Sequence, residues 1–323
     1  MPELPEMETY RTMLNERIAG RVVRDVEVTR EKTVNVPVDE FRRRVEGRAI
    51  ERVDRAGKML LFRLDDRWGA TRSGGGPPDG APAAREGIAA GAPAGRGGVA
   101  TLERPEARVG ADADAGAATA DTLALHLMLG GSMFYGSPDE APDRTAQVVF
   151  AFDAGKKLYF HGLRLGYLHI YGPEELETKL SKLGPNPLDP ALDAEAFAAR
   201  LRRARGAIKF ALTDQAVFAG IGNCYADEML FAAGILPLRK TADVDDAELR
   251  RLFAAMRSTF AEAIRYGGYM EDPLYAGDER TGGYNDRCKV YDRGGEPCDR
   301  CGGPITKTES NGRKVFYCER CQR

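Results

Sequence analysis

The chain has 323 residues, of which 43% are hydrophobic and 30% are charged, and its formal net charge is -2. This composition is typical of a globular protein with about two domains and excludes a disordered chain. The chain has no run of 18 or more apolar residues, and its first residues, MPELPEMETY, lack the basic and apolar regions of a secretory signal. We therefore expect a cytoplasmic protein with no transmembrane helix and no membrane partner.

The first part of the chain is predicted to be one helix followed by β-strands. Residues 5–18 place apolar side chains at three- and four-residue spacing after Pro5, which suits the first helical position. Between Val22 and about Ile170, turn residues separate short strand-like runs such as AIERVDR, MLLFRL and AQVVFAF. Many short strands indicate a sandwich or barrel. We predict that residues 1–172 form an N-terminal β-sandwich domain with a leading helix.

A segment of different composition interrupts these strands. Residues 71–121 are dominated by Gly, Ala, Pro and Arg and contain no aromatic residue. Such a segment cannot bury enough surface to offset its chain entropy, and a longer loop adds only a logarithmic entropic cost to the fold. We predict a disordered insertion between two strands of a hairpin, near Trp68 on one side and Leu123 on the other.

The second part of the chain is predicted to be helical. Residues 173–190, which include the Pro-rich LGPNPLDP, are interpreted as a linker. Helical patterns follow at 194–204, 207–218, 224–233 and 246–266. The tight glycine turn AGIGN, at 219–223, joins the second and third helices. Residues 267–286 carry Gly, Pro and Tyr without periodicity, which predicts a mobile loop. We assign residues 191–286 to a helical domain and residues 287–323 to a separate unit.

The last unit contains the strongest local motif. Its cysteines follow the pattern C-x2-C-x16-C-x2-C, which lies within the spacing of structural zinc ribbons. Four thiolates satisfy the tetrahedral preference of Zn²⁺ and leave no open position for catalysis. We therefore predict one structural Zn²⁺. Its predicted ligands are Cys298, Cys301, Cys318 and Cys321.

The N-terminus offers a second, weaker chemical signal. Removal of Met1 would expose the secondary amine of Pro2, and an α-amino group has a pKa of roughly 8, against about 10.4 for lysine. A useful fraction of such an amine is neutral and nucleophilic. Its attack on a sugar C1′ would give an iminium that permits elimination of the 3′ phosphate. The adjacent Glu3 could serve as acid or base.

Several motifs appear together in the expected order: PELPE (2–6), AGK (56–58), GIGNCYADE (220–228), and GRKVFYC within the zinc ribbon. This combination resembles the formamidopyrimidine-DNA glycosylase/endonuclease VIII family over nearly the whole chain apart from residues 71–121. The resemblance implies an α+β multidomain fold with an N-terminal β-sandwich, a helix–two-turn–helix domain and a zinc ribbon. Damaged double-stranded DNA would lie in the cleft between the two large parts, bound by a monomer.

The resemblance also implies an activity and its residues. The family's members are base-excision repair glycosylases that remove oxidised bases and cut the abasic site by β/δ-elimination. Pro2 matches the Schiff-base nucleophile, and Glu3 matches the acid/base that helps open the deoxyribose ring. Glu6 matches a structural glutamate of the first helix. Lys58 matches the lysine of a hairpin turn that contacts phosphate and assists elimination.

Further matched residues would bind the DNA backbone. Asn223 precedes a helix whose free N–H groups favour phosphate, and Arg313 of the zinc ribbon offers a bidentate fork that would grip phosphates beside the lesion. Arg205 and Lys209 match a basic DNA-facing segment. A damaged base must leave the base stack before Pro2 can reach its sugar.

The chain departs from the formamidopyrimidine pattern where the family fills the gap left by the flipped nucleotide. HGLRLG, at 161–166, replaces Asp-Pro-Arg-Arg-Phe-Gly, so Arg164 is retained and Leu165 replaces the aromatic residue. The other wedge position falls at Met128 or Leu129, although both could equally be strand core. An apolar side chain can still prop open a base stack.

These departures lean toward the endonuclease VIII branch and leave the preferred lesion open between 8-oxoguanine or formamidopyrimidine and oxidised pyrimidines. We favour oxidised pyrimidines or ring-opened purines ahead of 8-oxoguanine, because a leucine supplies little stacking surface. Tyr269, Tyr275 or Tyr284 could stack on a flipped base. Two non-catalytic alternatives remain: a zinc-ribbon DNA-binding or regulatory protein, and a damage sensor in which the insertion recruits a partner. Intact Pro2, Glu3 and Lys58 count against both.

Overall fold

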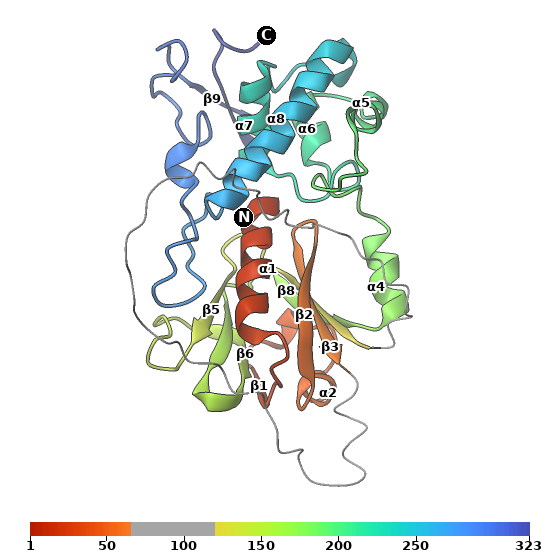
Figure 1. Cartoon of the computed structure of the whole chain (residues 1–323), viewed down its shortest axis with the longest axis vertical. Coiled ribbons are helices and arrows are strands. Elements are labelled where there is room, and N and C mark those ends of the chain that lie inside the picture. Colours follow the sequence, from red (N-terminus) through yellow and green to blue (C-terminus); the bar gives the residue numbers. More distant parts are fainter. Residues whose placement is uncertain (66–119) are drawn as a thin grey trace, which may run out of the picture.

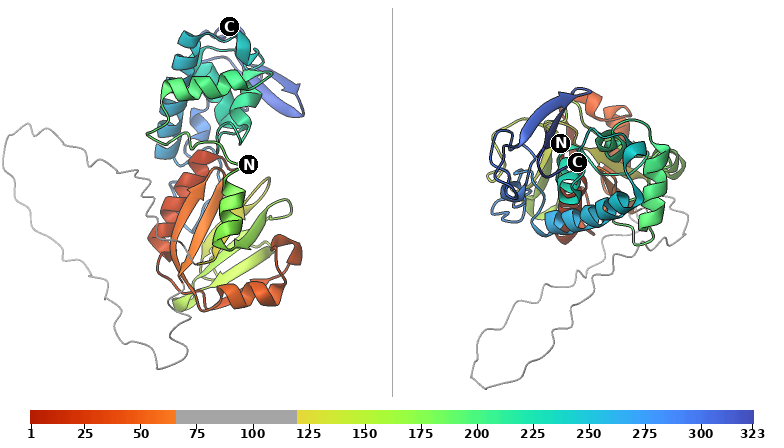
Figure 2. Two further views of the ribbon diagram at one scale, coloured as in Figure 1. Left: turned by 90° about the vertical axis from the view of Figure 1, so that its right-hand side faces the viewer. Right: turned by 90° about the horizontal axis from the view of Figure 1, so that it is seen from above.

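The computed structural model describes residues 1–65 and 120–323, which form two parts stacked along the long axis of the molecule (Figure 1). The N-terminus lies at the level where the two parts meet (Figure 2). No helix of the described residues combines the length and apolar character needed to cross a membrane. The predicted insertion at 71–121, and Trp68 beside it, fall almost wholly outside the described residues.

The N-terminal part is a sandwich of two antiparallel four-stranded sheets, with strand orders β1-β6-β7-β5 and β2-β3-β4-β8. The strands of the first sheet are β1 (Asp25–Val28), β5 (Ser132–Gly136), β6 (Ala146–Ala151) and β7 (Lys157–His161). Those of the second are β2 (Ala49–Ala56), β3 (Met59–Asp65), β4 (Thr122–His126) and β8 (Tyr167–Tyr171). Apolar side chains from both sheets share one core with the leading helix α1 (Leu4–Ile18). The predicted sandwich and its leading helix are confirmed.

Strands β3 and β4 are antiparallel neighbours, with Arg63 opposite Thr122. The chain between them therefore connects two paired strands, as predicted for the insertion. The short helix α2 (Val38–Val45) lies within the region predicted to contain only strands and was not expected. In α2, only Phe41 and Val45 are buried, so the apolar signal is too sparse to recognise.

The segment interpreted as a linker contains helix α4 (Pro173–Leu180). Leu176 packs with Leu61 and Ala124 on the face of the second sheet that is turned away from the main core. The chain then enters the helical part, whose helices are α5 (Ala194–Arg203), α6 (Ile208–Thr213), α7 (Asn223–Ala233) and α8 (Asp246–Arg265).

Helix α6 ends earlier than the sequence pattern predicts. After Thr213, the Asp214 side chain accepts the N–H of Ala216, and the Gln215 amide donates to the carbonyl oxygens of Thr213 and Ile221. These local bonds compete with helical hydrogen bonds. They form the turn that leads into α7.

The segment at 267–286 is attached to the N-terminal part over its first half. Leu274 is fully buried in the core of the sandwich, its carbonyl oxygen accepts the N–H of Tyr135 at 2.6 Å, and the Tyr10 hydroxyl donates to the carbonyl of Asp272 at 2.7 Å. The C-terminal unit adds the hairpin of β9 (Thr306–Ser310) and β10 (Arg313–Tyr317).

Candidate active site and zinc centre

The N-terminus is fixed against the first turn of helix α7. Oε1 of Glu3 accepts the N–H of Cys224 at 3.0 Å, and Oε2 accepts that of Tyr225 at 3.4 Å. Glu3 is only 2% exposed, and the free N–H groups and dipole of the helix N-terminus compensate its buried carboxylate. A Cβ on Gly222 would lie 2.2 Å from the carboxyl carbon of Glu3, so only glycine fits there. PELPE and GIGN therefore form a single site.

Glu6 fixes the residues around Glu3 through hydrogen bonds. Oε2 of Glu6 accepts the N–H of Glu3 at 2.8 Å, while Oε1 accepts the Tyr225 hydroxyl at 2.5 Å and the N–H of Tyr269 at 2.8 Å. Burial, with the neighbouring charge of Glu3, raises the pKa of Glu6 to about 7. Its contacts are all within the protein, which agrees with the structural role that the resemblance implies.

Lys58 lies on the tight turn between β2 and β3 and is 7% exposed. The adjacent Gly57 has a φ of +57°, and a Cβ there would lie 3.2 Å from the Cβ of Ala219, so the turn packs against AGIGN. Burial lowers the pKa of the Lys58 ammonium, Glu3 opposes this shift and Arg313 adds to it. Lys58, Glu3 and Arg313 therefore share one electrostatic environment.

The zinc-ribbon hairpin contacts the helices next to the Glu3 and Lys58 site. Nη1 of Arg313 donates to the Thr213 hydroxyl at 2.6 Å, and the side-chain amide of Asn223 donates to the carbonyl of Lys314 at 3.0 Å. Arg313 and Thr213 line an open cavity of about 500 Å³ beside them. Asn223 and Arg313, two of the three residues predicted to bind phosphate, are thus joined through the β10 strand.

Lys209 was predicted to face DNA, and this prediction is wrong. Its side chain is fully buried, and Nζ donates to Oδ2 of Asp227 and to the carbonyl of Lys314, both at 2.7 Å. The same carboxylate oxygen accepts the N–H of Phe316 at 3.1 Å. Lys209 therefore attaches the zinc-ribbon hairpin to helices α6 and α7.

Lys209→Ala is expected to lower the free energy of unfolding by about 3–5 kcal/mol, because it leaves the buried charge of Asp227 without its partner. Urea unfolding followed by circular dichroism measures this loss. The exposed Lys182 provides a matched control, since Lys182→Ala should change stability by less than about 0.5 kcal/mol. Equal, small effects of the two substitutions would contradict the structural role of Lys209.

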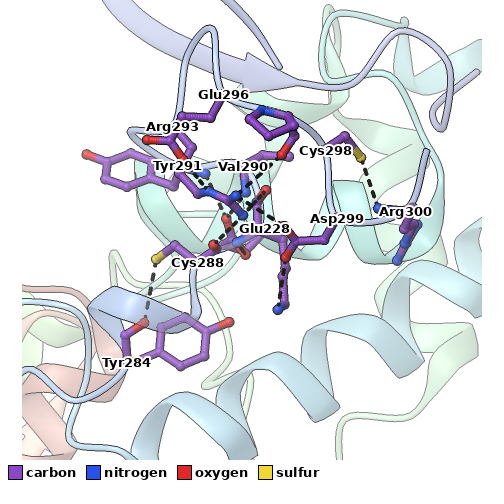
Figure 3. Close-up of polar contacts among 12 residues, drawn as sticks. Glu228, Tyr284, Cys288, Val290, Tyr291, Arg293, Glu296, Cys298, Asp299 and Arg300 are labelled. Carbon is purple, nitrogen blue, oxygen red and sulfur yellow. Dashed lines mark hydrogen bonds and ion pairs between the residues drawn. The ribbon is translucent and has the colours of Figure 1, made fainter. Parts of the chain in front are cut away.

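A second acid of α7 holds the segment that enters the zinc ribbon (Figure 3). Oε1 of Glu228 accepts the N–H groups of Val290 and Tyr291, and Oε2 accepts that of Lys289, each at 2.8 Å. Asp227 and Glu228 therefore hold the zinc ribbon at two different segments. Neither role was predicted, although two consecutive acids on an otherwise apolar helix are a usable signal.

The four predicted zinc ligands come together in space. The Sγ atoms of Cys298, Cys301, Cys318 and Cys321 all lie within 4.8 Å of one another. Cys298 and Cys321 are 3.8 Å apart, and Cys301 and Cys318 are 3.5 Å apart. Zn–S bonds of about 2.3 Å in a tetrahedron require sulfur separations close to these values. The residues fit one structural Zn²⁺, which would supply no catalytic chemistry.

Two loops of the N-terminal domain present exposed leucines. Leu129 and Leu165 are each 63% exposed, which excludes the strand-core alternative for Leu129. Their loops are in contact, because a Cβ on Gly162 would lie 1.9 Å from the carbonyl oxygen of Gly130. Met128 is half-buried in a left-handed conformation, with a φ of +52°.

The two remaining arginines of the predicted DNA surface lie on different domains. Arg164 is exposed on the β7–β8 loop, next to Leu165. Arg205 is exposed after α5 and lines a cavity of about 490 Å³ together with Arg200 and Arg203. Both positions are accessible to a ligand.

Comparisons with known proteins agree with this arrangement. Residues 1–78 match the formamidopyrimidine-DNA glycosylase N-terminal domain, residues 183–272 the H2TH domain, and residues 295–323 the zinc finger found in FPG and IleRS. Formamidopyrimidine-DNA glycosylases of Geobacillus kaustophilus and Halalkalibacterium halodurans are 33% and 32% identical, over the full length of both chains. The chain belongs to the formamidopyrimidine-DNA glycosylase family.

Structural similarity to solved proteins supports the same family assignment. A Lactococcus lactis FPG mutant in complex with DNA containing Fapy-dG superposes with a TM-score of 0.77 at 25% identity, covering 100% of both chains. As a member of the family, the chain is a base-excision repair DNA glycosylase with lyase activity at abasic sites. This sets aside the two non-catalytic alternatives.

Proposed function

We propose that Pro2, after removal of Met1, is the nucleophile of this glycosylase and that Glu3 is its acid/base. The observation that carries the proposal is the convergence at one point of the N-terminus, the Lys58 turn and the N-terminus of α7. Glu3 is both buried and held by two N–H groups, so its carboxylate is preorganised beside Pro2.

The covalent step accounts for strand cleavage at the abasic site. At an abasic site, the nitrogen lone pair of Pro2 forms a bond to C1′, the amine proton passes to the C1′ oxygen, and that oxygen leaves as water after taking a second proton. The resulting iminium withdraws electrons, so that C2′ loses a proton and the 3′ phosphate leaves. The buried carboxylate of Glu3 can give and take protons in these steps.

DNA binding is assigned to residues of both domains. Lys58, Asn223 and Arg313 would converge on backbone phosphates around the lesion, because the structure brings their segments together. Arg205 would contact phosphate farther along the helical domain. Arg164 with Met128 and Leu129 would occupy the gap left by the flipped nucleotide. We infer that a monomer in the cytoplasm binds damaged double-stranded DNA between its two domains.

Lys58→Ala and Arg313→Ala are each expected to weaken DNA binding at all sequences. Each substitution removes one phosphate contact. A plot of the logarithm of the association constant against the logarithm of the salt concentration should therefore become less steep, by about one unit of slope. Fluorescence anisotropy with a duplex containing a tetrahydrofuran site, measured over a series of salt concentrations, tests this. An unchanged slope for either variant would argue against direct phosphate contact by that residue.

The substrate class follows from the two exposed leucines. We propose that ring-opened purines and oxidised pyrimidines are removed ahead of 8-oxoguanine, since Leu129 and Leu165 offer little stacking surface to replace a well-stacked base. The names of the relatives favour ring-opened purines within this class.

Single-turnover excision rates test the substrate class. We compare duplexes that contain formamidopyrimidine, thymine glycol opposite adenine, and 8-oxoguanine opposite cytosine. The first two lesions should be removed faster than 8-oxoguanine. An 8-oxoguanine rate well above the thymine glycol rate would contradict the preference that we propose.

A further inference from the structure

The side chain of Tyr269 reaches the N-terminus of the chain. Its hydroxyl donates to the carbonyl oxygen of Met1 at 3.3 Å. That oxygen and the nitrogen of Pro2 belong to the same peptide group, with C=O and C–N bonds of about 1.23 and 1.33 Å. The Tyr269 hydroxyl oxygen therefore lies no more than about 6 Å from the Pro2 nitrogen.

The position of Tyr269 is fixed by its backbone and by its ring. Its N–H donates to Oε1 of Glu6 at 2.8 Å. A Cβ on the preceding Gly268 would lie 2.2 Å from the same oxygen, so the chain approaches Glu6 more closely than another residue would allow. The ring packs edge-on against Tyr225 and Tyr291, with centroid separations of 5.8 and 5.5 Å. The hydroxyl is thus held in place by contacts that do not involve Met1.

The other tyrosines considered for base stacking are placed differently. Tyr284 is 3% exposed and packs on Tyr225 with its centroid 5.7 Å away, so a flipped base cannot reach it. The ring of Tyr275 lies under the guanidinium of Arg17, 3.6 Å from the ring centroid, at the sandwich. Of the three, Tyr269 is the one whose hydroxyl bonds to Met1.

We propose that Tyr269 is a positioning residue for the nucleophile: once Met1 is removed, the freed Pro2 amine turns into the place of the Met1 carbonyl oxygen, and the Tyr269 hydroxyl oxygen accepts its N–H. A neutral secondary amine carries one N–H and one lone pair. Fixing the N–H leaves the lone pair free and gives it a defined direction for attack on the sugar. This inference rests on the proposed role of Pro2 and adds a residue that orients it.

The Tyr269 hydroxyl also affects the protonation of the Pro2 amine. Burial and the charge of Glu3 raise the pKa of the Tyr269 hydroxyl far above its ordinary value, so it stays neutral at all working pH values. A neutral hydroxyl oxygen also accepts a hydrogen bond from the protonated amine, which favours the charged form of Pro2. Removal of the hydroxyl should therefore lower the pKa of Pro2. The rise of the rate with pH, which follows deprotonation of the amine, should then move to lower pH.

The test uses the full-length protein, with loss of Met1 checked by mass spectrometry, and DNA that carries a preformed abasic site. The single-turnover rate of borohydride trapping is measured from about pH 5 to pH 9 for the wild type, Tyr269→Phe and Tyr284→Phe. Tyr269→Phe keeps the packed ring and removes only the hydroxyl. Tyr284→Phe removes a hydroxyl from the same aromatic cluster but lies away from Met1, so it controls for the loss of a buried hydroxyl.

We expect Tyr269→Phe to lower the plateau rate by about tenfold, as for loss of one orienting hydrogen bond, and to shift the rising limb to lower pH. Tyr284→Phe should match the wild type within about twofold. If Tyr269→Phe has the plateau rate of the wild type, or if its rate rises over the same pH range, the inference is overturned while the role of Pro2 stays intact. Equal impairment of both variants would also overturn it, because packing would then explain the loss. Absence of trapping in the wild type would refute the role of Pro2 and, with it, this inference.

Discussion

Replacement of Pro2 by glycine is expected to lower strand cleavage at a preformed abasic site by about 10³-fold or more, as for removal of a covalent nucleophile in other enzymes. Glycine is also small enough for Met1 to be removed, so the variant keeps a free amine, but it loses the secondary amine and the fixed ring. Single-turnover cleavage of a labelled duplex measures the effect.

Binding of a tetrahydrofuran duplex serves as the control for the Pro2 variant. Asn223 and Arg313 bond to Lys314 and Thr213 and not to the Pro2 ring, so affinity should stay within a few-fold of the wild type. Cleavage by Pro2→Gly at the wild-type rate would show that another group attacks C1′, and the assignment of the nucleophile would then be wrong.

Cys318→Ser is expected to have the second large effect, because it removes one of four zinc ligands from a unit with a very small apolar core. Metal binding supplies much of the folding free energy of such units. The variant should lose its zinc, and affinity for damaged duplex DNA should fall on the order of 100-fold, since the supports of both Arg313 and Asn223 are lost together.

Elemental analysis and anisotropy, applied to Cys318→Ser and Cys288→Ala side by side, check this expectation. Cys288 is a buried thiol outside the metal cluster, so its alanine variant should keep one zinc per chain. Full zinc content in Cys318→Ser, or equal zinc loss in both variants, would contradict the assignment of the ligands.

The sequence predicted those features whose signal is local. Helix α1 follows from periodicity after Pro5, and the zinc ligands follow from two CxxC motifs at a fixed spacing. It failed where partners distant in the chain decide the outcome. Lys209 has the sequence context of a DNA-facing lysine, and only its burial against Asp227, which lies on a different helix, shows that it is structural.

In the candidate site, too, local motifs could be predicted and contacts between distant segments could not. Pro2 and Glu3 could be proposed from PELPE, but the contact of Glu3 with the N–H groups of α7 required the folded chain. Tyr269 lies in a segment without periodicity, and its orientation depends on hydrogen bonding to Glu6 more than 260 residues away along the chain. No sequence pattern reports such a contact.

Identification of the residue that becomes covalently attached to DNA tests the central claim most directly. The wild-type protein is incubated with abasic DNA and borohydride, digested with a protease, and the peptide that carries the deoxyribose remnant is sequenced by mass spectrometry. The proposed function predicts that the remnant is on the nitrogen of Pro2, in a peptide that lacks Met1. A remnant on Lys58 or any other lysine, or a trapped chain that still carries Met1, would contradict it.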